Sequence, residues 1–305
     1  MVYYDVLAWH QWKGGKKMTN NSIKNVTSVI DYIEEHLTEK MDLDSVANAV
    51  HYSKHHLHRL FTNTIGLTIG EYVQRRKLTE AAMLLVFSNK PILDIALIAG
   101  YESQQAFTNI FTAMYKQSPR KYRNNEKFYP LQAKFEFEEG YDMLDNEENI
   151  QWDIDYASEE DIPCWMVLVR LVIDGFPNLD EEEYIQVLKQ RIKTKQALIL
   201  KINEVAIGAM LFSYKTGSID FMGTHPLYRK KGIPQAFLDK VMSDLLKGKK
   251  ISITTYRDGD KADTGHRKAI MDLGFAEAEL LVEFGYPTQR FVLPKEKINE
   301  YKTET

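Results

Sequence analysis

The chain has 305 residues, of which 44% are hydrophobic and 27% are charged, and it holds one cysteine, Cys164. This length predicts two or three domains, the apolar content excludes wholesale disorder, and the lone thiol excludes a disulfide framework or a multi-cysteine zinc site. No apolar run reaches the roughly 18 residues that cross a bilayer. The first residues also lack the pattern of a signal peptide, so we expect no membrane association and a cytoplasmic location.

The formal net charge of −4 is unevenly spread. Residues 1–130 carry +4 and residues 131–305 carry −8, while segment 54–123 alone carries +6. Such asymmetry predicts domains with different partners, one of them a nucleic acid.

Residues 1–19 form an extension to which we assign no fold, and Met18 is an alternative start. Apolar residues at helical spacing predict a helix over 23–37. Asp42 or Asp44 caps a short helix, and Ser53 caps the next one. Two short helices joined by a tight turn are a helix-turn-helix unit, and a longer helix over 69–87 follows it.

The pattern then repeats 50 residues later. Ser103 stands in the place of Ser53, and the 11-residue step from Phe61 to Tyr72 recurs from Phe111 to Tyr122. Internal repeats are strong evidence of repeated structure. We therefore expect two helix-turn-helix units joined by one helix, although helical pairs also occur in ordinary α-bundles.

In a helix-turn-helix unit the second helix enters the major groove, where Arg can pair with guanine and Gln or Asn with adenine. Nearby cations contact phosphates. The predicted DNA-binding residues are Lys54, His55, His56, His58, Arg59, Gln104, Gln105, Thr108, Asn109, Lys116, Arg120, Lys121 and Arg123. The histidine cluster lacks a carboxylate partner and a good i, i+4 pair, so we expect a solvated face and no metal.

These residues carry a resemblance to a known family. The run Ser53–Phe61, the run Pro91–Ala96 and the run Gly100–Gln104, followed by Ser118-Pro119 and Tyr122-Arg123, are similar to an AraC-type DNA-binding domain over about residues 20–124. The resemblance implies seven helices, contact of a monomer with two groove segments of double-stranded DNA, and transcriptional regulation. Asn109 stands where the family usually has a basic residue, and Lys116 where it usually has glycine.

Residues 125–150 are predicted to be an acidic linker, 151–293 a second domain, and 294–305 a tail. In this domain we expect strands at 151–156, 198–202, 205–214, 218–224, 250–255 and 278–284, with helices at 180–195, 232–246 and 266–273. Alternation of this kind indicates an α/β or α+β domain.

A basic, glycine-containing loop opens the helix at 232–246. Arg229, Lys230 and Lys231 precede Gly232 at its start, and a helix N-terminus favours phosphate through its free N–H groups and positive end. The alternative is a basic turn that only decorates the surface.

The spacing of Arg229, Gly232 and Pro234 resembles the acetyl-CoA motif of GNAT N-acetyltransferases, over about residues 151–293. The resemblance implies a GNAT-like fold with a mixed central sheet and an acetyl-CoA or other acyl-CoA ligand. The predicted cofactor-binding residues are Met222, Thr224, Arg229, Lys230, Lys231, Gly232, Ile233 and Gln235. Pro234 lacks an N–H donor, and Ile270 stands where many members have a tyrosine as general acid.

Acyl transfer to an amine needs a base for the amine proton and an acid for the thiolate. Asp220 is the candidate base, and Tyr256 and His266 are candidates for acid or relay. Cys164 is expected to be a packed, inert thiol.

Three functions remain open from the sequence. The first is a transcription regulator whose second domain binds an acyl-CoA as effector. The second is an active N-acetyltransferase of a small amine or a protein, fused to a DNA-binding domain. The third is a regulator whose second domain has lost cofactor binding and makes only protein contacts. The oligomeric state is not predicted.

Overall fold

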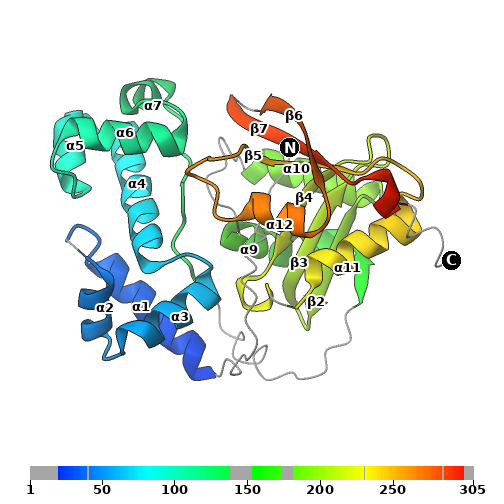
Figure 1. Cartoon of the computed structure of the whole chain (residues 1–305), viewed down its shortest axis with the longest axis horizontal. Coiled ribbons are helices and arrows are strands. Elements are labelled where there is room, and N and C mark those ends of the chain that lie inside the picture. Colours follow the sequence, from blue (N-terminus) through cyan, green and yellow to red (C-terminus); the bar gives the residue numbers. More distant parts are fainter. Residues whose placement is uncertain are drawn as a thin grey trace. The chain divides into compact units, whose positions relative to one another are not determined.

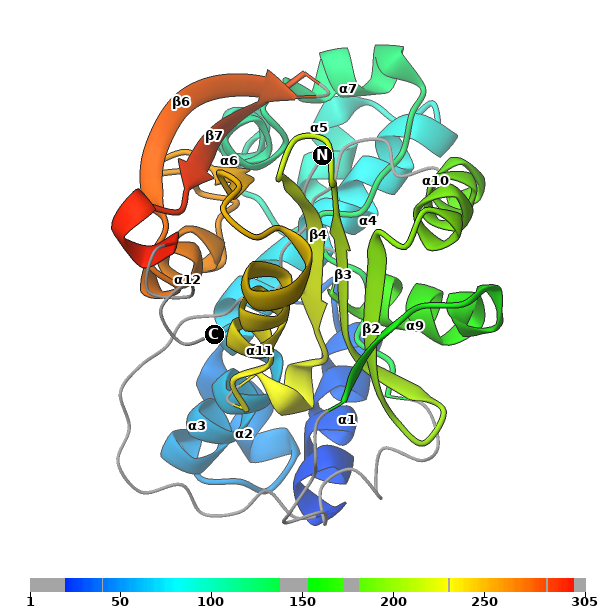
Figure 2. The same ribbon diagram turned by 90° about the vertical axis from the view of Figure 1, so that its right-hand side faces the viewer.

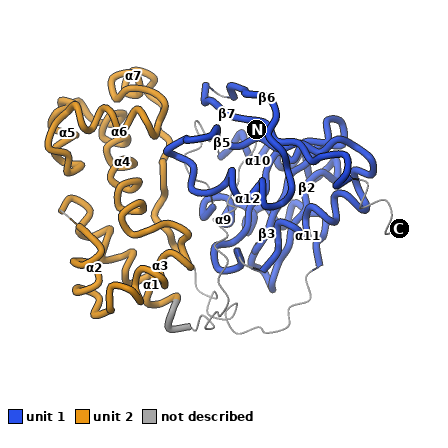
Figure 3. Tube along the Cα trace, in the orientation of Figure 1, with its two compact units in different colours: residues 1–10, 149–173, 179–305 blue, residues 11–148, 174–178 orange. Residues whose placement is uncertain are grey.

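The computed structural model describes residues 20–39, 41–137, 153–172, 181–229, 231–283 and 285–298. They divide into two compact units, which Figure 3 colours separately. We call residues 11–148 with 174–178 the helical unit, and the rest of the chain the sheet unit. The predicted extension 1–19 with Met18, and parts of the predicted linker (138–150) and tail (299–305), lie outside the described residues.

The helical unit is built around one long helix (Figure 1). Its described helices are α1 (Asn20–Glu35), α2 (Leu43–Ala49), α3 (Lys54–Ile65), α4 (Ile69–Phe87), α5 (Ile92–Ile98), α6 (Gln104–Tyr115) and α7 (Pro119–Asn125). The first three pack on one another, the last three do the same, and α4 contacts α3 at one end and α5 and α7 at the other.

The predicted repeat is present in the structure. α3 and α6 start 50 residues apart, each after a serine, Ser53 or Ser103, whose hydroxyl accepts a backbone N–H of the first turn. Each ends at a residue in the left-handed region, Gly66 with φ 82° and Lys116 with φ 59°. Lys116 therefore adopts the conformation for which glycine is the usual choice.

The turns inside the two helix-turn-helix units differ by one residue. The turn from α2 to α3 places His51 at φ 57°, and the longer turn from α5 to α6 places Gly100 at φ 80°. At the start of α2, the carboxylate of Asp42 accepts the N–H of Ser45, which identifies Asp42 as the cap.

Residues 126–137, predicted to belong to the linker, instead pack on the helical unit. Tyr129, Leu131, Gln132 and Phe135 are all at most 6% exposed. The helical unit therefore extends past the predicted boundary at residue 124.

The sheet unit holds two antiparallel sheets. In the first the strand order is β1-β2-β3-β4, formed by β1 (Ile154–Tyr156), β2 (Ala197–Ile202), β3 (Val205–Phe212) and β4 (Ile219–Thr224). In the second the order is β5-β7-β6, formed by β5 (Ser252–Tyr256), β6 (Ala276–Glu283) and β7 (Tyr286–Val292). A parallel bridge between Ser218 and Ser252 joins them, so the predicted mixed sheet is observed as two antiparallel sheets that meet at this point.

Helices cover both faces of the first sheet. Gly208 of β3 lies so close to α11 (Ile233–Lys240) that an added Cβ would come 2.7 Å from the ring of Phe237. Gly223 lies opposite Ala209, the neighbour of Gly208, and therefore faces the other side, where it approaches Val172 of α9 (Ile162–Val172). Figure 2 shows α11 and α9 on opposite sides of β2, β3 and β4.

The remaining described helices complete these layers. α10 (Glu181–Lys193) shares the face of α9, since Trp165 donates a hydrogen bond of 3.1 Å to Tyr184 and both rings contact Phe221. α12 (His266–Asp272) packs against β5. None of the described helices combines the length and the apolar character needed to cross a membrane.

Candidate nucleic-acid interface and phosphate loop

The start of α3 presents the predicted contact residues of the first unit to solvent. Lys54, His55, His56, His58 and Arg59 are all exposed, while the opposite side of the helix is buried in the core. Because the N-terminal turns of a recognition helix reach the base edges, this exposed face has the position that DNA contact requires.

The start of α6 likewise presents the predicted contact residues of the second unit to solvent. Gln104, Gln105 and Asn109 are exposed and Thr108 is partly buried. The side-chain amide of Gln105 donates a hydrogen bond of 2.8 Å to that of Asn109, so the two groups are held together along one face. Their amides can contact adjacent positions of one DNA strand.

The predicted phosphate-binding cations differ in their surroundings. Arg120 and Lys121 are exposed at the start of α7. Arg123 instead donates hydrogen bonds to the carbonyl oxygens of Leu85 and Lys90, at 3.1 and 2.7 Å. Its guanidinium therefore fixes the joint between α4 and α5, and a phosphate would have to compete with these bonds.

The histidine cluster lies on the exposed face of α3. Among the described residues, no set of three or more His, Cys, Asp or Glu side chains lies close enough together to hold a metal ion. His56 stacks on Tyr52 with ring centroids 5.4 Å apart.

The loop from β4 to α11 contains the predicted phosphate-binding residues. Met222 and Thr224 are buried at the end of β4, Arg229 is partly buried and Lys231 is exposed; Lys230 lies outside the described residues. Gly232 caps α11 with φ 74°, and a Cβ added there would meet no atom within 4 Å. Ile233 and Gln235 belong to the first turn of α11, where the backbone N–H groups point toward the N-terminal end of the helix.

Sequence reasoning missed a buried imidazole at the start of this loop. His225 is 0% exposed, and its Nδ1 accepts the backbone N–H of Leu227 at 3.2 Å. Burial, with the nearby positive charge of Arg229, lowers the pKa of His225 to about 3. A histidine before a proline gives no pattern that marks it as buried.

The three candidate catalytic residues do not lie together. Asp220, at the start of β4, forms an ion pair with Arg191 and accepts a hydrogen bond of 2.7 Å from Ser218. Tyr256 ends β5 and His266 begins α12, and their ring centroids are 5.5 Å apart. The roles of all three stay predictions, and a carboxylate neutralised by a guanidinium is a poor base.

Cys164 is partly buried in α9 and donates to the carbonyl oxygen of Asp161 at 3.2 Å. Burial, together with the negative charge of Asp161, raises the pKa of the thiol. Both effects reduce the thiolate fraction and hence the reactivity.

Sequence comparisons place the helical unit in a family. A helix-turn-helix domain model matches residues 46–125. The chain is 42% identical over 102 residues to a protein of Proteus vulgaris described as "Probable transcription factor PqrA", and this match covers 84% of that protein and 33% of this chain. The chain therefore belongs to the AraC-type helix-turn-helix family, and its helix-turn-helix domain matches at residues 46–125.

A longer relative matches over a similar length. YbfP of Bacillus subtilis, an HTH-type transcriptional regulator, is 39% identical over 100 residues. The match covers 33% of this chain and 34% of YbfP, so this chain spans about a third of the length of that relative.

One solved structure has a distant likeness to part of the chain. A GNAT-family acetyltransferase from Bacillus cereus aligns over 47% of this chain and 96% of its own, with 18% sequence identity and a TM-score of 0.36. A likeness at this TM-score supports no conclusion about chemistry.

If α3 and α6 are the recognition helices, Arg59→Ala and Gln104→Ala will each weaken binding to a selected duplex by about 1–3 kcal/mol. Each variant loses the side-chain group that is expected to form hydrogen bonds with a base edge. Titration of labelled duplex by fluorescence anisotropy measures the effect. Arg170→Ala and Gln186→Ala, exposed on α9 and α10, are the matched controls. Equal affinities for all four variants would contradict the assignment.

The lowered pKa of His225 predicts a pH-dependent stability. Between pH 6.5 and about 3 the unfolded chain binds a proton that the folded chain excludes. The contribution of the buried, neutral His225 to the free energy of unfolding is therefore complete above pH 6.5, and it is lost as the pH falls from 6.5 toward 3. Urea unfolding of the sheet unit measures the free energy of unfolding at pH 7 and pH 5. Between these pH values His225→Asn should lose less of this free energy than the wild type does, and its amide oxygen can still accept the N–H of Leu227. The exposed His58→Asn is the control, and an unchanged loss in His225→Asn would exclude this origin.

Proposed function

We propose that the protein is a sequence-specific transcription regulator whose sheet unit binds acetyl-CoA or another acyl-CoA as effector. The DNA-binding part of this proposal rests on the AraC-type domain and on the two exposed recognition-helix faces. The effector part rests on one observation, the divergence of β4 from β5 beside a basic loop.

β4 is open along one edge. It pairs with β3 on one side, and on the other side the described pairing with β5 is the bridge at Ser218 and Ser252. From Phe221 to Thr224 the described ladder of β4 is the one with β3, which leaves β4 at the edge of its sheet. An extended chain with amide groups, such as pantetheine, can bind a strand edge as an added strand would.

The residues at the far end of β4 fit a phosphate-bearing ligand. The hydroxyl of Thr224 is buried and has no hydrogen-bond partner among the described residues, which is unusual for a buried polar group. Next along the chain, Arg229 and Lys231 bring positive charge to the N-terminus of α11. The open space at Gly232 lets a ligand approach the backbone closely. Arg229, Lys231 and the amides of Gly232, Ile233 and Gln235 would hold the pyrophosphate.

Effector binding alters transcription only if the ligand prefers one state of the protein. By linkage, an acyl-CoA changes DNA affinity to the extent that its own affinity differs between the DNA-bound and free chain. The proposal therefore includes a measurable coupling between the two ligands.

The second candidate function is N-acetyltransfer to a small amine or a protein. The observation in its favour is the Tyr256–His266 pair, because both groups can carry protons. The pairing of Asp220 with Arg191 argues against Asp220 as the base and so favours sensing.

Calorimetry of the full chain with acetyl-CoA tests the effector. We expect binding with one site, and we expect Arg229→Ala to weaken it about tenfold because a charge-assisted hydrogen bond to phosphate is lost. Lys247→Ala, an exposed lysine after α11, is the matched control. The absence of heat in the wild type would overturn the effector assignment. Release of free thiol from acetyl-CoA in the presence of amines would instead establish the enzyme.

A further inference from the structure

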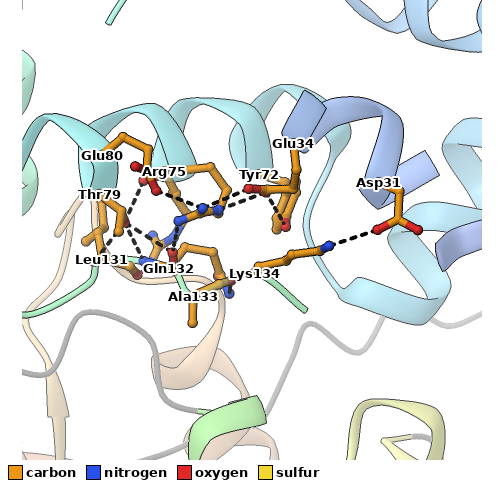
Figure 4. Close-up of polar contacts among 11 residues, drawn as sticks. Asp31, Glu34, Tyr72, Arg75, Thr79, Glu80, Leu131, Gln132, Ala133 and Lys134 are labelled. Carbon is orange, nitrogen blue, oxygen red and sulfur yellow. Dashed lines mark hydrogen bonds and ion pairs between the residues drawn. The ribbon is translucent and has the colours of Figure 1, made fainter. Parts of the chain in front are cut away.

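We infer that residues 129–135, which we call the strap, hold the two helix-turn-helix units at a fixed separation and so determine the spacing of DNA contacts that the protein accepts. The inference rests on the DNA-binding role of the helical unit. The strap begins four residues after the end of α7. Figure 4 shows it running along α4 toward α1.

The strap is anchored to the second unit through a pair of tyrosines. The hydroxyl of Tyr122 in α7 donates to the carbonyl oxygen of Tyr129 at 3.0 Å and accepts the N–H of Tyr129 at 3.0 Å. Just before the strap, the ring of Phe128 contacts that of Phe87, at the end of α4. Burial of Tyr122 raises its pKa, so the phenol stays protonated and keeps both bonds.

The middle of the strap is held by one hydroxyl of α4. Oγ1 of Thr79 accepts the N–H groups of Leu131 and Gln132, at 3.1 and 3.0 Å, and lies 3.1 Å from the carbonyl oxygen of Gln132. Arg75 donates to the carbonyl oxygen of Leu131 at 3.3 Å. These contacts replace the neighbouring strand that an extended segment would otherwise need for its backbone groups.

The far end of the strap reaches α1, which packs on both helices of the first unit. Arg76 of α4 donates to the carbonyl oxygen of Gln132 at 3.1 Å and to both carboxylate oxygens of Glu34 in α1, at 2.8 and 2.7 Å. Lys134 forms an ion pair of 2.9 Å with Asp31, also in α1. The strap is thus bonded to elements from α7 to α1.

Without the strap, α4 would be the main connection between the units. In both views α3 and α6 lie at opposite ends of α4 (Figures 1 and 2). A single helix permits bending and twisting at its two joints, at residues 66–68 and 88–91. A second connection along the same path restricts both bending and twisting.

The stiffness matters because the two units bind one duplex together. When two sites are linked, the second binds at an effective concentration that depends on how well the linkage fits the span. A stiff linkage favours one spacing strongly, whereas a loose one tolerates neighbouring spacings. The strap therefore contributes to specificity without touching a base.

The test is binding of the full chain to a duplex selected from a random pool, and to the same duplex with one base pair inserted or removed between the two contacted segments. We expect the wild type to lose about 100-fold in affinity on this change, and Thr79→Val to lose about tenfold or less. Thr79→Val keeps the shape of the side chain but removes the hydroxyl that binds the strap. Lys134→Asp, at an exposed position, should reduce the spacing preference in the same direction, and Asp31→Lys in the same chain should restore it.

Val26→Ala is the matched control, because Val26 lies on the buried face of α1, so its truncation creates a cavity in the core and leaves the strap bonds intact. It lowers stability but should keep the spacing preference of the wild type. If the Thr79 and Lys134 variants keep that preference as well, the strap is only a structural segment and the inference is wrong. Failure of the wild type to select any duplex would overturn the DNA-binding role itself, which is a different result.

Discussion

The buried ion pair between Arg76 and Glu34 is the interaction on which the helical unit depends. The two side chains are 9% and 15% exposed, and the guanidinium also binds Glu80 and the strap. Burial alone would lower the pKa of Arg76, but the hydrogen bond and charge of Glu34 outweigh it and raise the pKa. Removing one partner of such a pair costs about 3–5 kcal/mol, since the other is left buried and unpaired. The position of α1 against α4, and hence of α3 in its unit, follows from this contact.

The two units use charge in different ways. In the helical unit the surplus of positive charge lies in segment 54–123, which contains the faces proposed for DNA contact. The sheet unit holds nearly equal numbers of acidic and basic residues, 24 Asp and Glu against 22 Lys and Arg, and Arg229 and Lys231 concentrate positive charge beside the N-terminus of α11. The net charge of the whole chain conceals both features because the contributions cancel.

The repeat could be predicted from sequence because it depends on local signals. Capping serines, left-handed residues after helices and apolar spacing of 3.6 are all encoded within a few residues, and Ser53, Ser103 and Gly66 behave as their types require. β7 was not predicted, because Pro287 and the polar run Thr288–Arg290 disguise the central strand of its sheet. The strap was missed for a related reason: Pro130 and the acidic residues after it are typical of a linker. Its burial depends on Thr79 and Arg76, which are more than 50 residues away in sequence.

For the candidate site, the exposed recognition faces followed from the helical pattern, but the partners of the charged residues did not. Arg123 and Asp220 were chosen as single functional groups, and the structure shows each engaged by distant groups, the backbone of Leu85 and Lys90 in one case and Arg191 in the other. Whether a charged side chain is available to a ligand depends on contacts that residue type and spacing do not encode.

The central claim is that one chain places two recognition helices on one duplex. Hydroxyl-radical footprinting of the full chain on a selected duplex tests it most directly. We predict two protected segments centred about one helical turn apart, roughly 10 base pairs, on the same face of the DNA. A single protected segment, or two segments on opposite faces, would contradict it.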